Sequence, residues 1–291
     1  RIVAVLARFM HWVMRVSGSE ALSNVASAFV GQVEAQIMIR PYLSGMTMSE
    51  LLASMTGSMA CIAGGVMAVY ISMGVPASYL LAASLMAAPG ALVISKIVFP
   101  ETQESETKGV VKIEVKKEQT NIMDAISHGA SDGMAISINV IAMLIGVIAL
   151  VALVDALLGY FGLFLGWTGL SLDFIGLDVD NLRLKDVFGA FFSLFAIVMG
   201  VPVAESFEVG SLMGTKMVIN EFVAYSDLAP MIHAGVLSPK SIVIASFALC
   251  GFANFSSIAI QLGGIGAMVP SRKADLARLG FKAMICGTMA S

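Results

Sequence analysis

The chain has 291 residues, of which 58% are hydrophobic and 13% are charged, and its mean hydropathy is +0.89. A soluble domain carries about 25% charged residues, so the composition indicates an all-α integral membrane protein. A membrane β-barrel would show short alternating segments instead. The net charge of −3 gives no reason to expect nucleic acid as a partner. The cysteines lie in apolar runs without metal or haem spacing, so we expect no cofactor.

The two ends of the sequence suggest a piece of a longer protein. The chain begins at Arg1 without a signal-peptide pattern, and it stops at Ser291 inside an apolar run. Residues 1–20 are predicted to form an amphipathic helix at the membrane interface, because Arg8 and Arg15 interrupt an apolar run. An ordinary connecting helix fits this pattern equally well.

A first hairpin is predicted at residues 21–44, where polar residues occupy the centre of an apolar segment. A carboxylate at bilayer depth, such as that of Glu34, costs on the order of 3 kcal/mol. Irregular backbone at that depth must be surrounded by protein or by water. Gln32 and Glu34 at the centre, with Arg40-Pro41 closing the segment, therefore favour a re-entrant hairpin over a spanning helix.

Two spans complete the first predicted unit, residues 21–99. Residues 51–73 are long enough to cross a bilayer, but the small residues at 60–65 predict a break in their helix. Residues 77–99 form a second span with a kink at Pro89-Gly90. Both spans follow the hairpin directly, so this unit reads hairpin, broken helix, helix.

The middle of the chain is predicted to separate two such units. Residues 100–135 hold a charged cytoplasmic loop and a short linking helix, and residues 136–160 form a long scaffold helix. Residues 187–291 repeat the first pattern, with a second hairpin around Glu205 and Asn220-Glu221, a helix broken at 251–257, and the start of a last helix. Lys and Arg are more frequent in the loops 101–121 and 271–278, which places these loops in the cytoplasm.

The order of elements therefore predicts two inverted-type repeats that meet at one site. Interrupted apolar segments in corresponding positions of two halves are the best sequence indication of a transporter's binding site. The side chains that the breaks bring to mid-membrane are Gln32, Glu34, Glu205, Phe252, Asn254 and Ser257. Amides, carboxylates and one phenyl ring suit a neutral, polyhydroxylated ligand with a planar ring. A phosphorylated ligand would require Arg or Lys, which are scarce at that depth.

Several motifs along the chain resemble the concentrative nucleoside transporter family. They cover the chain from about residue 20 to its end. The most specific are Gly31-Gln32-Val33-Glu34-Ala35, Asn220-Glu221-Phe222-Val223-Ala224-Tyr225 and Cys250-Gly251-Phe252-Ala253-Asn254. The resemblance implies a multi-pass protein of the cell inner membrane, a homotrimer in the lipid bilayer. Its transport domain moves as in an elevator and carries a uridine-like or purine nucleoside inward with a cation.

The resemblance also implies roles for individual residues. Gln32, Val33 and Glu34 would face the nucleobase, with Val66 nearby. The ribose hydroxyls would be bound by Glu205, Asn254 and Ser257, with Phe252 packed on the ligand. The sodium site of the family would be formed by Ser27, Cys61 and the carbonyls of Val30 and Ile62.

Two differences from the family's pattern bear on the coupling ion. Sodium-coupled members have asparagine and a hydroxyl residue where this chain has Ser27 and Cys61, and a thiol is a poor ligand for a hard cation. A proton needs only one titratable group, for which Glu34 and then Glu205 are candidates, so proton coupling is predicted over sodium coupling. Position 33 also differs, because Val33 replaces a hydroxyl residue, and this predicts an altered base preference.

Two other classes of function remain as alternatives. A channel or structural membrane subunit would lack coupled uptake, but a channel should show a filter motif or repeated charged rings. A membrane hydrolase could use Glu34 or Glu205 as a general base, but no nucleophile accompanies them. We therefore expect a transporter and not an enzyme.

Overall fold

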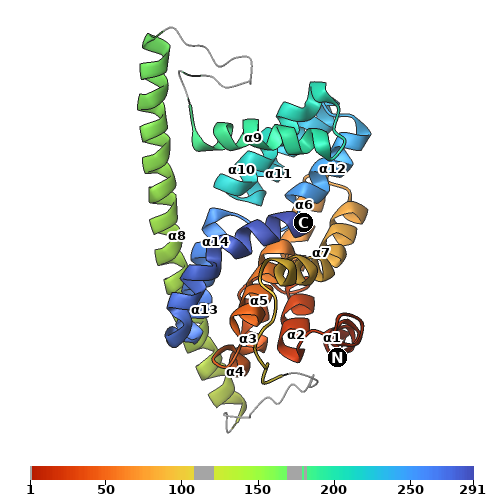
Figure 1. Ribbon diagram of the computed structural model, residues 1–291, viewed down its shortest axis with the longest axis vertical. Coiled ribbons are helices and arrows are strands. Elements are labelled where there is room, and N and C mark those ends of the chain that lie inside the picture. Colours follow the sequence, from red (N-terminus) through yellow and green to blue (C-terminus); the bar gives the residue numbers. More distant parts are fainter. Residues whose placement is uncertain (1, 108–120, 169–178, 180–181) are drawn as a thin grey trace.

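The structure is a computed structural model that describes residues 2–107, 121–168, 179 and 182–291. The described residues form helices and no strands, which confirms the predicted all-α class (Figure 1). Most of the predicted charged loop, at 108–120, lies outside the described residues. In this view α1–α5 lie toward the bottom and α9–α12 toward the top, α14 crosses the middle, and α13 lies beside α8 at the height of α5.

The first half contains seven helices among its described residues: α1 (Ile2–Met14), α2 (Gly18–Ser27), α3 (Glu34–Met38), α4 (Arg40–Leu43), α5 (Met48–Ala60), α6 (Gly64–Ser72) and α7 (Ala77–Val98). Capping boxes start two of them. The Ser17 and Glu20 side chains cap the start of α2, and those of Thr47 and Glu50 cap α5. These caps fix where the first hairpin and the broken helix begin.

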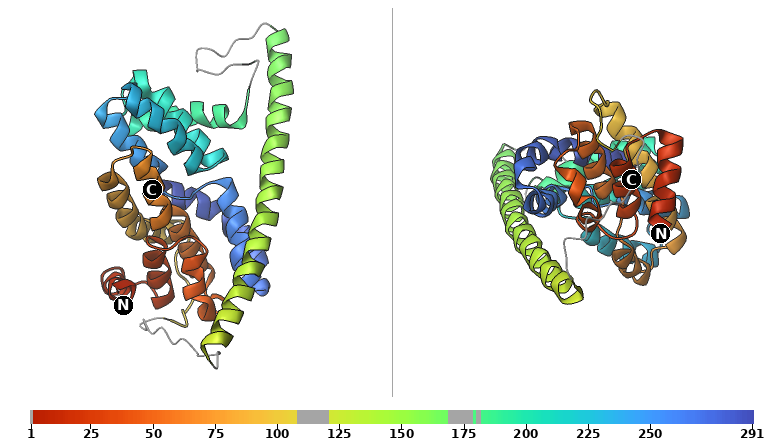
Figure 2. Two further views of the ribbon diagram at one scale, coloured as in Figure 1. Left: turned by 180° about the vertical axis from the view of Figure 1, so that it is seen from behind. Right: turned by 90° about the horizontal axis from the view of Figure 1, so that it is seen from below.

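The predicted linking helix and scaffold helix are a single helix. The helix α8 runs over Ile122–Trp167, 46 residues, and stands along one side of the molecule (Figures 1 and 2). At 1.5 Å per residue its length is about 70 Å. The expected separation near residue 135 does not occur, because Gly129 and Gly133 each cost only about 1 kcal/mol inside a helix.

The second half contains α9 (Leu184–Val198), the 3-10 turn η3 (Val203–Glu205), α10 (Ser206–Val218), α11 (Glu221–Ala234), α12 (Pro239–Leu249), α13 (Phe255–Met268), the turn η4 (Pro270–Arg272) and α14 (Lys273–Ala290). The segment predicted as one hairpin therefore holds three helices and two turns. The turn between α10 and α11, at 219–220, precedes the broken helix α12–α13 just as the turn between α2 and α3 precedes α5–α6. The second hairpin tip is thus at Asn220 and not at Glu205.

The two helix breaks lie against each other. The first break separates α5 from α6 at 61–63, and the second separates α12 from α13 at 250–254. Gly251, with a φ of +104°, lies so close to the first break that a Cβ atom there would be 2.5 Å from the Ala60 carbonyl oxygen. Only glycine combines this left-handed backbone with such an approach.

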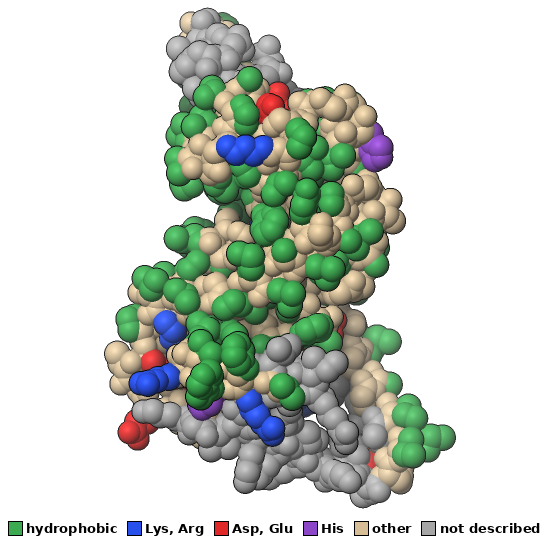
Figure 3. Space-filling view, turned by 90° about the vertical axis from the view of Figure 1, so that its right-hand side faces the viewer, with side chains coloured by type: hydrophobic (Ala, Val, Ile, Leu, Met, Phe, Trp, Pro, Cys, Tyr) green, Lys and Arg blue, Asp and Glu red, His purple; other side chains and the backbone are tan. Residues whose placement is uncertain are grey.

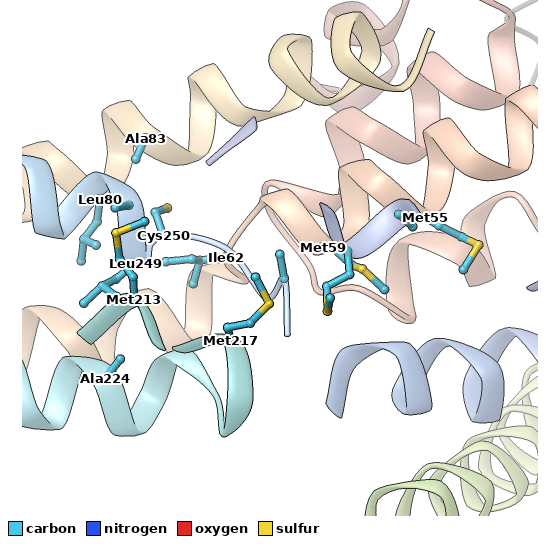
Figure 4. Packing of buried hydrophobic residues seen from close by; sticks show 14 of the residues in the cluster. Met55, Met59, Ile62, Leu80, Ala83, Met213, Met217, Ala224, Leu249 and Cys250 are labelled. Carbon is cyan, nitrogen blue, oxygen red and sulfur yellow. The ribbon is translucent and has the colours of Figure 1, made fainter. Parts of the chain in front are cut away.

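One hydrophobic core joins the two halves. It includes Met55 and Ile62 from the first broken helix and Met213 and Leu249 from the second half, all buried. Figure 4 shows Ile62, Met213 and Leu249 lying near one another beside the second break. Flexible methionine side chains fill irregular gaps well, and such gaps occur where two interrupted helices meet.

Within the described residues, three helical stretches are long and apolar enough to cross a membrane. They are the broken helix Met48–Ser72, α7 and α8. The distribution of side chains on the surface is consistent with a membrane-spanning protein. In Figure 3 hydrophobic side chains cover the middle of the visible face, and charged side chains lie toward its two ends. The chain is therefore a multi-pass membrane protein.

Candidate functional site

Two cavities lie side by side where the hairpin tips approach the second helix break. The second-hairpin cavity has a volume of about 510 Å³ and is lined by the tip of α10–α11, the start of α13 and one face of α8. The first-hairpin cavity has a volume of about 490 Å³ and is lined by the tip of α2–α3, the start of α6 and a lower part of α8. Gln32, Phe252 and Ile260 line both cavities, so the two form one region with a shared wall.

The first hairpin places Gln32 at the centre of this region. The Gln32 side chain is 9% exposed, and its Nε2 donates a long hydrogen bond of 3.4 Å to Ser257 Oγ. Its Oε1 is buried and accepts no hydrogen bond from any described residue. An unpaired buried acceptor costs about 1–3 kcal/mol, so this oxygen favours a ligand that brings a donor.

The other residues predicted to face a nucleobase lie at the first-hairpin cavity. Val33, Glu34 and Val66 all line it. Glu34 starts α3, and its carboxylate folds back against Gly31 at the hairpin tip. The Val33 side chain is buried against α13, where a Cβ atom on Gly264 would lie 2.7 Å from its methyl carbons. The predicted base set is therefore brought together in one cavity.

The second hairpin places Glu221 at the other cavity. Asn220 caps α11, its Oδ1 accepting from Val223 N at 2.9 Å. Glu221 follows it at the first helical position, where the helix dipole favours a carboxylate. Its side chain is 6% exposed, Oε1 accepts from Tyr70 Oη at 3.1 Å, and Oε2 accepts from Asn254 Nδ2 at 3.1 Å. Glu221 is thus the buried carboxylate of the second-hairpin cavity.

Glu205 is placed elsewhere, contrary to the role predicted for it. It lines neither cavity, and its Oε2 accepts from Ser238 N and Ser238 Oγ, both at 3.0 Å. These two hydrogen bonds provide an acceptor for the backbone N–H and the hydroxyl of Ser238, the residue that caps α12. Hydrogen bonds from the Ser241 hydroxyl and from Ser238 lower the pKa of Glu205. The local reason is that η3 ends at Glu205, and the 13 residues of α10 separate it from the hairpin tip.

The second break supplies the remaining predicted residues. Asn254 caps α13, with its Oδ1 accepting from Ser257 N at 2.8 Å while its amide donates to Glu221. Ser257 is 1% exposed and lines the same cavity, and Phe252 projects into the wall shared by both. Asn254 therefore ties the start of α13 to the second hairpin, and the N-terminus of this half-helix faces the cavity.

Sequence reasoning missed one further carboxylate, Asp155 on α8. It lines the second-hairpin cavity, and its Oδ1 accepts from Leu184 N at 2.8 Å at the start of α9. The signal was present, since Asp155 lies in an otherwise apolar helix and intramembrane carboxylates are functional candidates.

The residues predicted to hold a cation are engaged with the protein. Ser27 Oγ donates to Ser23 O at 2.8 Å and lies 3.1 Å from Ser58 Oγ. The Cys61 thiol points to Ser84 O at 3.8 Å. Val30 is 41% exposed at the hairpin tip, whereas Ile62 is fully buried. The four lie on the facing ends of α2 and α5–α6, but Ser27 and Cys61 direct their hydrogens at other acceptors.

A network around Gln36 explains why Ser27 is engaged. Gln36 Nε2 donates to Ser23 Oγ at 3.0 Å and to Ser58 Oγ at 2.6 Å, and Gln36 Oε1 accepts from Ser54 Oγ at 2.7 Å. Because the Ser27 hydrogen goes to Ser23 O, Ser58 is left to donate to Ser27. Because the Ser54 hydrogen goes to Gln36, Ser23 donates to Ser54, 2.6 Å away. The hydroxyl directions are thus determined by the network itself.

Comparison with known proteins identifies the family. The family model described as "Na+ dependent nucleoside transporter C-terminus" matches residues 79–291. An uncharacterized transporter of Haemophilus influenzae is 44% identical over 294 residues, covering 100% of this chain and 67% of that protein. The nucleoside permease NupC of Helicobacter pylori is 39% identical and covers 94% of this chain and 63% of the permease.

Solved structures agree with these relatives. The transporter CNTnw in an inward-facing substrate-bound state is 42% identical and superposes with a TM-score of 0.78, covering 99% of this chain and 65% of CNTnw. The chain thus spans about two thirds of the length of these proteins. Because these relatives are transporters, the hydrolase alternative is set aside. The match in sequence and in fold together shows that the chain belongs to the concentrative nucleoside transporter family.

Proposed function

We propose that the chain binds nucleosides and, within its transporter, imports them by cation-coupled symport. The observation that carries this proposal is Glu221, a buried carboxylate held by Tyr70 and Asn254 at the edge of a cavity of about 510 Å³. Charge-assisted hydrogen bonds to a carboxylate are stronger than neutral ones, and vicinal ribose hydroxyls are suitable donors.

The composition of the cavities supports a neutral ligand. Neither cavity is lined by a described Lys or Arg, so a phosphate group would find no countercharge. We assign the nucleobase to the first-hairpin cavity, beside Gln32, Glu34 and Val66, and the ribose to Glu221, Asn254 and Ser257. Phe252 in the shared wall would pack on the ligand. In this assignment Glu221 takes the role that was expected of Glu205.

We propose proton coupling and keep sodium coupling as the competing hypothesis. Sodium requires several oxygens at once, whereas Ser27 and Cys61 direct their hydrogens at Ser23 and Ser84. Two carbonyls alone would leave sodium under-coordinated. Candidate proton carriers are Glu34 and Glu221, the carboxylates at the two hairpin tips. The description of the matching family model as sodium-dependent is the reason to keep the alternative.

The quaternary arrangement is part of the same proposal. The helix α8 exposes apolar side chains along its length, including Ile138, Ile141 and Ile145. Such a surface suits lipid or a second copy of the chain, and we propose that α8 belongs to a scaffold of a homotrimer in the inner membrane. The hairpins and broken helices would then form the part that moves in an elevator-like step.

Uptake of radiolabelled uridine into vesicles tests the function directly. The transporter containing this chain should accumulate unmodified uridine when a pH gradient, acidic outside, is imposed without sodium. A protonophore should abolish accumulation, and replacing sodium by choline should not change it. Strong sodium dependence at fixed pH would overturn the proton hypothesis, and uptake that never exceeds equilibration would favour a channel.

A further inference from the structure

A tyrosine that touches neither cavity is bonded to the carboxylate that the proposed function depends on. Tyr70 lies in α6, is 0% exposed, and its Oη donates to Glu221 Oε1 at 3.1 Å. The two residues are 151 positions apart and belong to opposite halves of the chain. This hydrogen bond therefore connects the first broken helix to the tip of the second hairpin.

The Tyr70 ring has little freedom to move. It stacks on Tyr225 with ring centroids 4.3 Å apart and planes inclined by 30°. The Phe222 ring lies beside it, tilted by 48°, with the two ring centroids 6.3 Å apart. Tyr225 is itself fixed, because its Oη donates to Ser246 O at 2.8 Å. A rigid aromatic stack thus aims the Tyr70 hydroxyl at Glu221.

The donors around Glu221 leave part of its carboxylate for a ligand. A carboxylate offers about four lone-pair positions on its two oxygens. Tyr70 occupies one position on Oε1, and Asn254 occupies one on Oε2. Lone-pair positions therefore remain beyond these two bonds, and these suit the hydrogens of a pair of neighbouring hydroxyls.

We propose that Tyr70 is a positioning residue for ribose recognition, which fixes the Glu221 carboxylate in the orientation that receives both ribose hydroxyls. The inference rests on the proposed function, since it needs a ribose at Glu221. Preorganised side chains bind more tightly because the ordering cost is met before the ligand arrives. Without the Tyr70 hydroxyl, the carboxylate can rotate about its last side-chain bonds and must be ordered by the ligand.

The test compares Tyr70→Phe with Tyr225→Phe in the complete transporter. Both substitutions remove one phenol oxygen from the same aromatic stack, but only the first touches Glu221. Tyr70→Phe should weaken uridine binding about tenfold and should weaken 3′-deoxyuridine binding less, so that discrimination between the two ligands falls. Tyr225→Phe should keep the wild-type discrimination. Binding is measured by calorimetry on purified protein, with the melting temperature recorded for each variant.

Equal discrimination in Tyr70→Phe and wild type would overturn the inference while leaving nucleoside binding intact. A wild-type transporter that binds no nucleoside would overturn the proposed function and this inference together. Should Tyr70→Phe not fold, 3-fluorotyrosine at position 70 provides a stronger donor in nearly the same shape. Uridine should then bind at least as tightly as to the wild type, and weaker binding would count against the inference.

Discussion

The two halves fasten their hairpins to their broken helices by different chemistry. In the first half the junction is neutral: Gln36 on α3 bonds to serines of α2 and α5, all buried. In the second half the junction is charged: Lys216, near the end of α10, is 2% exposed and donates from Nζ to Ala248 O at 2.8 Å and to Cys250 O at 3.3 Å. The hairpin is thus held to its broken helix by an amide that follows the tip in the first half and by an ammonium that precedes the tip in the second half.

This difference bears on where an exchangeable ion could bind. The last carbonyls of a helix lack intrahelical partners and carry partial negative charge. At the end of α12 the Lys216 ammonium donates hydrogen bonds to these carbonyls. The second half therefore supplies its own positive charge at this helix end, from a lysine side chain. At the facing ends of α2 and α5, Ser27 and Cys61 are engaged without any lysine among their described partners. Under the competing sodium hypothesis, the ion would therefore bind in the first half.

The largest effect is expected from removing the charge at the second hairpin tip. Glu221→Gln should reduce uridine uptake roughly 100-fold or more, because two charge-assisted bonds of about 1.5–3 kcal/mol each become neutral ones. The matched control is Glu205→Gln, which alters a carboxylate outside both cavities and should leave uptake close to wild type. Loss of uptake in the Glu205 variant with normal expression would reverse this assignment.

The next largest effect concerns the charged junction. Lys216→Met keeps the length of the side chain but leaves the carbonyls of Ala248 and Cys250 without their donor. We expect the free energy of unfolding to fall by about 3 kcal/mol, in the range for breaking a buried charged contact. Lys240→Met, at an exposed lysine of α12, serves as control. Chemical denaturation in detergent compares them, and equal stability of the two variants would contradict a structural cation.

A smaller effect is expected at the neutral junction. Gln36→Leu removes four hydrogen bonds among groups that can partly bond to one another, so the cost should be about 1–2 kcal/mol. Gln261→Leu is the control, because Gln261 is also buried but its amide donates one bond, to Met55 O at 3.1 Å. Denaturation should show a larger loss for Gln36. If Gln36→Leu were as stable as wild type, the network would not hold the hairpin.

The smallest effect is expected at the base. Val33→Thr adds a hydroxyl in a side chain of nearly the same shape, and one neutral hydrogen bond contributes about 1 kcal/mol, or roughly fivefold in affinity. The preference among uridine, cytidine, adenosine and guanosine should shift while uptake continues. Competition assays measure the rank order, and an unchanged order would show that position 33 does not read the base.

Much of this organisation could be predicted from the sequence, because small residues and glycines mark both helix breaks. The polar residues around Gln32 also predicted a re-entrant hairpin, and its tip lines the first-hairpin cavity. The choice between Glu205 and Glu221 could not be made in this way, since each follows an apolar run near a helix start. It is decided by Tyr70 and Asn254, 151 and 33 positions away from Glu221 in the sequence.

The continuity of α8 was also beyond sequence reasoning. Polar residues and two glycines before residue 135 indicate a boundary, but their combined helix cost is small. Asp155 was overlooked for a related reason, since a single carboxylate hardly changes the hydropathy of a long apolar segment. Its contact with Leu184 N depends on how α9 meets α8, which no local pattern encodes.

The approach of Gly251 to the Ala60 carbonyl has a mechanical consequence. With no side chain between them, the two breaks have no room to slide past each other, and any larger residue at 251 would force them apart. The walls contributed by each half to the paired cavities therefore keep a fixed spacing. In the proposed transport step, a ligand that touches both walls would move together with them, and a displacement of one half would be transmitted to the other through this crossing.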